Sequence, residues 1–414
     1  MNTIESNLKE NWLRNIILFL SSQTITLFGS SLVQYAIMWH ITLTTESGLM
    51  MTLFILCGFI PTFILSPVAG VWADRYNRKI LIVLADGLIA SATLILAILF
   101  LMGYDPIWLL FVMAGIRAFG TGVQMPAVGA ILPQIVPQDK LTKVNGVNGS
   151  IQAIIMFLSP MVSAALLGFA TIETIFFIDV ITAAIGIVTL LFFVKVAVHK
   201  KAREKQTVSY LNDFKLGVKY VNNHKFLKVF FIFLAIFFVL MAPASFLTPL
   251  QVTRSFGDDV WRLSATEIAF SVGMMIGGGI IASWGGFQNR IKTLGFASVI
   301  MGICTFALGV VPNFWIYLAF MALFGVAMPI LNTPATVLLQ EKVEEEYLGR
   351  VFGVMGMIST SMMPLGMLIF GPIADFIRIE WMLVGTGIFI TVLAIFLGRN
   401  KVLIEAGKPV VKES

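Results

Sequence analysis

Apolar residues follow one another in long runs along almost the whole chain, and short polar stretches separate the runs. A helix that rises 1.5 Å per residue needs about 20 apolar residues to cross a bilayer core of ~30 Å, and the runs reach that length. The pattern therefore predicts an all-α membrane protein with twelve transmembrane helices. The predicted spans are residues 14–43, 47–73, 80–102, 107–132, 143–168, 174–196, 227–250, 264–285, 292–311, 314–339, 349–372 and 381–398.

The composition supports this class. Hydrophobic residues make up 58% of the 414 residues and charged residues only 12%, whereas soluble globular chains carry roughly 25% charged residues. The net charge of +6 could suggest a nucleic-acid partner. Its distribution along the chain indicates the lipid bilayer instead, and no nucleic acid is expected.

Basic residues are concentrated in alternate loops. If both termini are cytoplasmic, 24 of the 28 Lys and Arg lie in cytoplasmic segments, and only Arg254, Arg262 and Arg378 lie in external loops. The remaining one, Arg117, falls within a span. Loops rich in Lys and Arg stay on the cytoplasmic side of a membrane. We therefore expect both termini to be cytoplasmic.

A basic segment divides the spans into two sets of six. We expect an N-terminal six-helix bundle over residues 1–196, a cytoplasmic linker over 197–226, and a C-terminal bundle with a tail over 227–414. Nine Lys or Arg fall between residues 195 and 228. Apolar residues recur there at helical spacing, which favours an amphipathic helix at a membrane surface over a solvated loop; they are Leu211, Phe214, Val218 and Val221.

Two short patterns occur once in each half. The pattern L-x-[KR]-V-x-G-V-x-G begins at residue 141 and again at residue 348, an offset of 207. Pro-Ala occurs at 126 and at 334, an offset of 208. Both pairs fall on equivalent spans. They predict two pseudo-symmetric bundles with a substrate site near the middle of the membrane.

The turn between the second and third spans is unusually charged, with the sequence GVWADRYNRK over residues 70–79. It resembles the signature G-x-x-x-D-[RK]-x-G-[RK]-[RK] of the major facilitator superfamily, whose fold is a pair of six-helix bundles. The matching residues are Gly70, Asp74, Arg75, Arg78 and Lys79. Asn77 replaces the usual Gly, and because Asn tolerates a left-handed backbone, we expect the tight turn to be kept.

This charged turn has two interpretations. Its basic residues can simply fix the topology. Alternatively, the carboxylate of Asp74 can accept hydrogen bonds from the N-terminus of a neighbouring helix. The resemblance implies that this helix is the eleventh span, which begins near Gly349, and that the contact is a gating latch between the bundles.

Features of the second half resemble the macrolide-efflux branch of bacterial drug exporters, namely Thr266-Glu267-Ile268, the segment 284–287 and the segment 340–352. The resemblance implies a multi-pass protein of the bacterial cytoplasmic membrane. Its function would be proton-coupled antiport of a macrolide-like or other hydrophobic drug by alternating access. In the fifth span, Ser159-Pro160 stands where the antiporter motif has Gly-Pro, which weakens the case for antiport.

Other functions remain alternatives. The chain could transport a metabolite such as a siderophore, peptide, sugar or lipid-like compound, or export a tetracycline-type drug. No Walker phosphate loop occurs, so an ATP-binding partner protein stays an open alternative without support from the chain. The chain has three His and two Cys, and no nucleophile with a nearby base, so we expect no enzyme activity, no metal and no cofactor.

Ionisable residues inside spans are costly and therefore indicate function. Arg117 lies near the middle of the fourth span and needs an acceptor, for which Asp179 and Asp86 are the candidates. We interpret the three as proton-coupling candidates, and a buried pair that only orients helices is the alternative. Glu267 and Glu173 lie near outer span ends, where we expect them at the surface.

Uncharged polar residues within spans predict the lining of the substrate cavity, although some of them could instead form hydrogen bonds between helices. The candidates are Gln23, Gln34, Gln124, Asn148, Gln152 and Asn332. In the eighth span, Gly273, Gly277 and Gly279 favour close helix packing.

Overall fold

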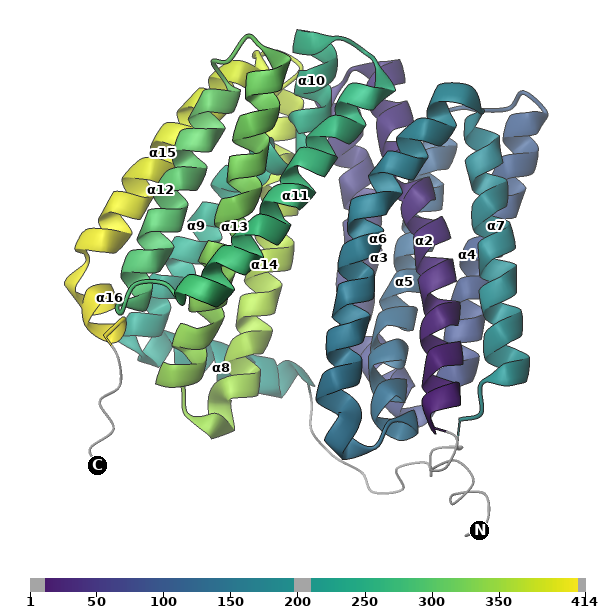
Figure 1. Cartoon of the computed structure of the whole chain (residues 1–414), viewed down its shortest axis with the longest axis horizontal. Coiled ribbons are helices and arrows are strands. Elements are labelled where there is room, and N and C mark those ends of the chain that lie inside the picture. The colour runs from purple at the N-terminus through teal and green to yellow at the C-terminus, as the bar shows by residue number, and fades with distance from the viewer. Residues whose placement is uncertain (1–11, 197–209, 409–414) are drawn as a thin grey trace. The chain divides into compact units, whose positions relative to one another are not determined.

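A computed structural model describes residues 12–196 and 210–408, and it is helical (Figure 1). In the described ranges, 12 helices are long and apolar enough to cross a membrane. They are α2 (Trp12–Thr45), α3 (Gly48–Arg75), α4 (Arg78–Leu101), α5 (Trp108–Ile135), α6 (Leu141–Phe169), α7 (Ile172–Val188), α9 (Lys225–Phe246), α11 (Val260–Trp284), α12 (Arg290–Leu308), α13 (Phe314–Lys342), α14 (Glu345–Ile373) and α15 (Ile379–Arg399). The prediction of an all-α protein with twelve spans is confirmed.

Shorter elements connect or extend these spans. They are the 3₁₀ turn η1 (Gln138–Lys140), the π-helical turn η2 (Thr189–Phe193), α8 (Tyr210–Asn223), α10 (Thr248–Phe256) and α16 (Lys401–Ala406). The seventh span ends earlier than predicted, at Phe246 rather than at residue 250. The reason is that Pro249 lies in the first turn of α10, where a missing backbone N–H costs nothing.

Several helices begin where an Asn side chain caps the first turn. Asn77 accepts a hydrogen bond from the backbone N–H of Lys79 at 3.0 Å and so begins α4. Asn289, Asn313 and Asn400 cap α12, α13 and α16 in the same way. Asn77 is extended, with φ −66° and ψ 112°. The tight turn is kept as expected, since only Tyr76 and Asn77 separate α3 from α4. Asn77 keeps it as an N-cap, for which extended backbone is usual, rather than with a left-handed backbone.

The chain divides into two compact units. Unit 1 comprises Met1–Ile41 and Leu53–Gln206, and unit 2 comprises Thr42–Thr52 and Thr207–Ser414. The segment Thr42–Thr52 contains the end of α2 and the start of α3. It therefore packs with unit 2, although the remainder of both helices belongs to unit 1.

The core of unit 1 forms where α2, α4, α5 and η2 meet. Phe19, Ile82, Ile131 and Leu190 are all fully buried there and form one apolar cluster. Burial of large apolar side chains at the same end of four helices fixes their register. The polar residues about three to four turns along each helix from this cluster are thereby brought to a common level.

In unit 2, α11 packs tightly against α13. A Cβ atom at Gly273 would lie 1.9 Å from the carbonyl oxygen of Ala322, and one at Gly277 would lie 2.2 Å from that of Val326. The two helix backbones therefore touch, which only Gly permits. Close packing was predicted for both residues. Gly279, predicted with them, is exposed and has open space beside it, so for this residue the prediction was wrong.

Candidate functional site

A buried ion pair lies within unit 1. Arg117 of α5 donates from Nη1 to Oδ2 of Asp179 on α7 at 2.6 Å, and the two side chains are 8% and 0% exposed. Of the two predicted acceptors, Arg117 therefore contacts Asp179. Charges removed from water in this way are tolerable only when they are paired and hydrogen-bonded.

Two further helices supply the remaining hydrogen bonds of this pair. Ser30 of α2 donates from Oγ to Oδ1 of Asp179 at 3.2 Å, and its backbone carbonyl accepts from Nη2 of Arg117 at 2.9 Å. Oγ1 of Thr93 on α4 accepts from Nη1 of Arg117 at 3.1 Å and lies 3.2 Å from Oδ2 of Asp179. The pair is thus held by α2, α4, α5 and α7 together. Any change in its charge state would act on four spans.

A second carboxylate is buried separately. Asp86 of α4 is 2% exposed and accepts a hydrogen bond from Nε2 of Gln124 on α5 at 2.7 Å. Asp86 therefore has an amide partner rather than a cation. Gln124 was predicted as a cavity residue, and its side-chain amide donates at least one hydrogen bond to Asp86.

The basic residues of the charged turn hold helices of unit 1 together. Arg78 donates from Nε to the carbonyl of Ala73 and from Nη1 to that of Ala130, each at 2.8 Å. Lys79 donates from Nζ to the carbonyls of Leu191 and Val194 at 2.9 and 2.8 Å. Both side chains thus contact carbonyls at or near helix ends, where cations are favourable.

The other motif residues are less fully described. The backbone of Gly70, Asp74 and Arg75 lies in the last turns of α3. Their side-chain positions lie outside the described part of the structure. The proposed latch partner of Asp74, the start of α14 near Gly349, belongs to unit 2.

The predicted cavity residues differ in exposure. Gln34, Gln152 and Asn332 are exposed, whereas Gln23, Gln124 and Asn148 are half-buried. All except Asn332 belong to unit 1. Their role in a substrate cavity stays a prediction.

Unit 2 contains a polar cluster that sequence reasoning missed, at the end where α3 begins. The carboxylate of Asp375 accepts hydrogen bonds from the backbone N–H groups of Gly48 and Leu49 at 2.6 and 3.1 Å, and from Oγ of Ser47 at 2.8 Å. It therefore caps the N-terminus of α3 from a residue more than 320 positions away in the sequence. We call these four residues together with Arg254 the Asp375 cap.

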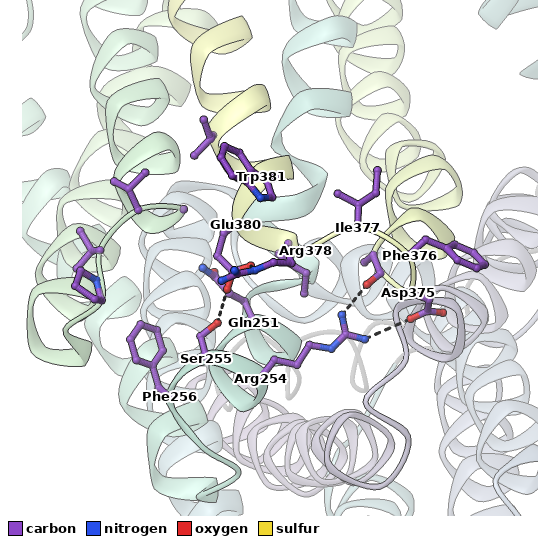
Figure 2. A pocket seen from close by; sticks show the side chains of 17 residues that line it. Gln251, Arg254, Ser255, Phe256, Asp375, Phe376, Ile377, Arg378, Glu380 and Trp381 are labelled. Carbon is purple, nitrogen blue, oxygen red and sulfur yellow. Dashed lines mark hydrogen bonds and ion pairs between the residues drawn. The ribbon is translucent and has the colours of Figure 1, made fainter.

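Arg254 of α10 completes the Asp375 cap. Its Nη2 lies 3.5 Å from Oδ1 of Asp375, and its Nη1 donates to the carbonyl of Ala374 at 2.6 Å (Figure 2). Nη2 also donates to the carbonyl of Glu46. The side chains of Arg254 and Asp375 are 30% and 24% exposed. The side chain of Arg254 thus connects α10 to two backbone carbonyls and to the carboxylate of Asp375.

A cavity of about 760 Å³ adjoins the Asp375 cap within unit 2. Arg254, Ser255 and Glu380 contribute to its walls, and Oγ of Ser255 donates to Glu380 at 2.7 Å (Figure 2). None of the six predicted cavity residues lines it. The one sequence signal for this region was the rarity of external Arg residues, which include Arg254.

Comparisons with known proteins agree with this architecture. The family model of the Major Facilitator Superfamily matches residues 15–367. Macrolide efflux protein A of Streptococcus pyogenes is 31% identical over 389 residues, which cover 93% of this chain and 95% of that protein. A protein of the same name from Enterococcus faecalis is 32% identical over 316 residues, covering 75% of this chain and 97% of that protein.

Solved structures of other proteins share this fold. The crystal structure of the nucleoside transporter NupG superposes with a TM-score of 0.70 at 17% identity, covering 95% of this chain and 100% of that one. Twelve apolar spans and bacterial efflux relatives make this a multi-pass protein of the bacterial plasma membrane. The chain belongs to the Major Facilitator Superfamily of membrane transporters.

Proposed function

We propose that this transporter exports macrolide-like hydrophobic drugs in exchange for protons, by alternating access. The observation that carries the proposal is 31% identity to a macrolide efflux protein over 93% of the chain. The absence of a Walker phosphate loop from the sequence favours an ion gradient over ATP as the energy source.

The buried ion pair supports the proton-coupled part of the proposal. Asp179 and Arg117 are shielded from water, and an ionisable pair buried within membrane spans marks a functional element. A change in the access of water to this pair would accompany the change of state of the transporter. Asp86, with only Gln124 as a described hydrogen-bond partner, is the second candidate proton carrier.

The charged turn supports a gating role. Arg78 and Lys79 hold the turn to the ends of neighbouring helices, which keeps the end of α3 in a fixed position within unit 1. Asp74 would then act as the latch that the start of α14 engages, and its release would accompany the change of state. Replacement of Asp74 by Asn should shift the distance distribution between spin labels on the two predicted cytoplasmic faces, and an unchanged distribution would refute the latch.

Drug accumulation in cells tests the export function. Cells that express the chain should accumulate less of a radiolabelled macrolide than cells with an empty vector, and a protonophore should abolish the difference. Tetracycline is the second compound to test. Asp179→Asn and Asp86→Asn should each weaken export or change its pH dependence.

The matched control for these variants is Asp258→Asn, because Asp258 is exposed in the loop after α10. Export by Asp258→Asn should equal that of the wild type. If accumulation of every lipophilic drug is unaffected by expression while a metabolite is transported, the export function is wrong. If both buried variants export with unchanged pH dependence, the coupling assignment is wrong.

A further inference from the structure

Glu267 is an acidic residue within a membrane span of unit 2. It is the eighth residue of α11, which begins at Val260, so it lies about 10 Å along the helix axis from the start. The other acidic residues with described side chains in the spans of unit 2, Glu341 and Glu380, lie at helix ends. Among the acidic residues of unit 2 whose side chains are described, Glu267 is therefore the only one that lies well inside a span.

The side chain of Glu267 lies on the covered side of α11. Residues three or four positions away share its face of the helix, and of these Leu263, Ser264 and Ser271 are 2%, 5% and 8% exposed. The opposite face carries Val272 and Ile276, which are 37% and 52% exposed. Glu267 itself is half-buried. Glu267 therefore lies between the buried stripe and the exposed stripe of α11.

No described residue pairs with this carboxylate. Glu341 forms an ion pair with Arg290, and Glu380 accepts hydrogen bonds from Ser255 and Arg378. In the described part of the chain, Glu267 has neither a hydrogen bond nor an ion pair. An unpaired carboxylate at membrane depth is costly, so its retention indicates a partner that comes from outside the chain.

The position of Glu267 is rigid. One turn further along α11, Phe270 touches α13 closely, since a Cβ atom at Gly325 would lie 2.2 Å from the carbonyl oxygen of Phe270. The rings of Phe270 and Phe324 lie 6.0 Å apart. Glu267 and Phe270 are three residues apart and so share a face of α11. A carboxylate on the same helix face as an aromatic ring suits an organic cation with an apolar body.

We propose that Glu267 binds the protonated amine of a lipophilic cationic substrate. This inference rests on the proposed export function and narrows its substrate class to amphiphiles with a basic amine. The carboxylate selects the positive charge, while the adjacent aromatic and aliphatic side chains of α11 and α13 contact the apolar part. A hydrogen bond between two charged groups is stronger than a neutral one, so the amine should contribute measurably to affinity.

Two macrolides that differ in a single charge provide the test. One carries a secondary amine on its sugar, which is protonated at neutral pH, and the other is its neutral N-acetyl derivative. Export of each is measured in proteoliposomes that contain the wild type, Glu267→Gln, Glu267→Asp or the control Glu341→Gln, which removes an acid at the end of α13. We expect Glu267→Gln to lower kcat/KM for the amine about tenfold or more and to leave the N-acetyl derivative almost unchanged.

The outcomes separate this inference from the proposed function. Glu267→Asp keeps the charge and should retain much of the preference for the amine, and Glu341→Gln should retain all of it. If the wild type exports neither compound, the export function itself is wrong. If the wild type exports both and Glu267→Gln treats them as the wild type does, or loses both equally while keeping the thermal unfolding midpoint, the assignment of Glu267 to the amine is wrong.

Discussion

Two arginine–aspartate pairs of this transporter, Arg117–Asp179 in unit 1 and Arg254–Asp375 in unit 2, are chemically alike and differ in environment. The first has a separation of 2.6 Å and is almost fully buried. The second has a separation of 3.5 Å, with side chains that are 30% and 24% exposed. A buried pair must stay complete because either charge alone is unstable, whereas a half-exposed pair is screened by water and contributes little.

The two aspartates consequently have different tasks. The carboxylate oxygens of Asp179 are bound by side chains from three other spans, Ser30 of α2, Thr93 of α4 and Arg117 of α5. Asp375 is bound mainly by backbone N–H groups at the start of α3, with Arg254 as an additional partner. The structural value of Asp375 therefore lies in capping a helix, and that of Asp179 lies in neutralising a cation.

Breaking the buried pair should have the largest effect. Asp179→Asn or Arg117→Gln alone leaves one buried charge and should destabilise the protein by about 3–5 kcal/mol. The double variant leaves no charge and should recover most of this loss. Thermal unfolding of the four purified proteins in one detergent measures the coupling.

The double variant also tests the proposed function of the pair. It should be stable and yet export drug without the pH dependence of the wild type, because it has neither the carboxylate at position 179 nor the guanidinium at position 117. Destabilisation of the double variant equal to the sum of the two single losses would contradict the coupling. Unchanged pH dependence would assign the pair to structure alone.

The second largest loss of stability should come from a substitution at the close backbone contact of the Asp375 cap. A Cβ atom at Gly48 would lie 2.2 Å from the carbonyl oxygen of Gly371, so Gly48→Ala should force the start of α3 away from the cap and cost about 1–3 kcal/mol. Gly58→Ala is the matched control in the same helix, because nothing lies within 4 Å of its Cβ position. It should be neutral or stabilise by up to about 1 kcal/mol. Equal loss in both variants, measured by thermal unfolding, would refute the contact.

Sequence patterns predicted the buried pair Arg117–Asp179 far better than the Asp375 cap. Long apolar runs give the spans, and a lone Arg117 inside a run requires a buried acid, which limited its partner to Asp86 or Asp179. The Asp375 cap has no such signal, since Asp375 lies in a turn, where charges are ordinary, and Gly48 is a single small residue at the start of α3. For Glu267, sequence patterns indicated its distance from the span end and did not indicate on which side of the helix it lies.

The smallest effects should distinguish the charge of the Asp375 cap from its hydrogen bonds. Asp375→Ala removes the acceptor of two backbone N–H groups and should cost about 1–2 kcal/mol, as for other helix caps. Arg254→Ala removes the half-exposed ion pair, which should contribute less than about 1 kcal/mol and fall further at high salt. Thermal unfolding at low and high salt measures both, with Asp258→Ala as the control acid of the same region. If Arg254→Ala were the more damaging change, the ion pair rather than the helix cap would hold the start of α3 in unit 2, and the contrast between the two aspartates would fail.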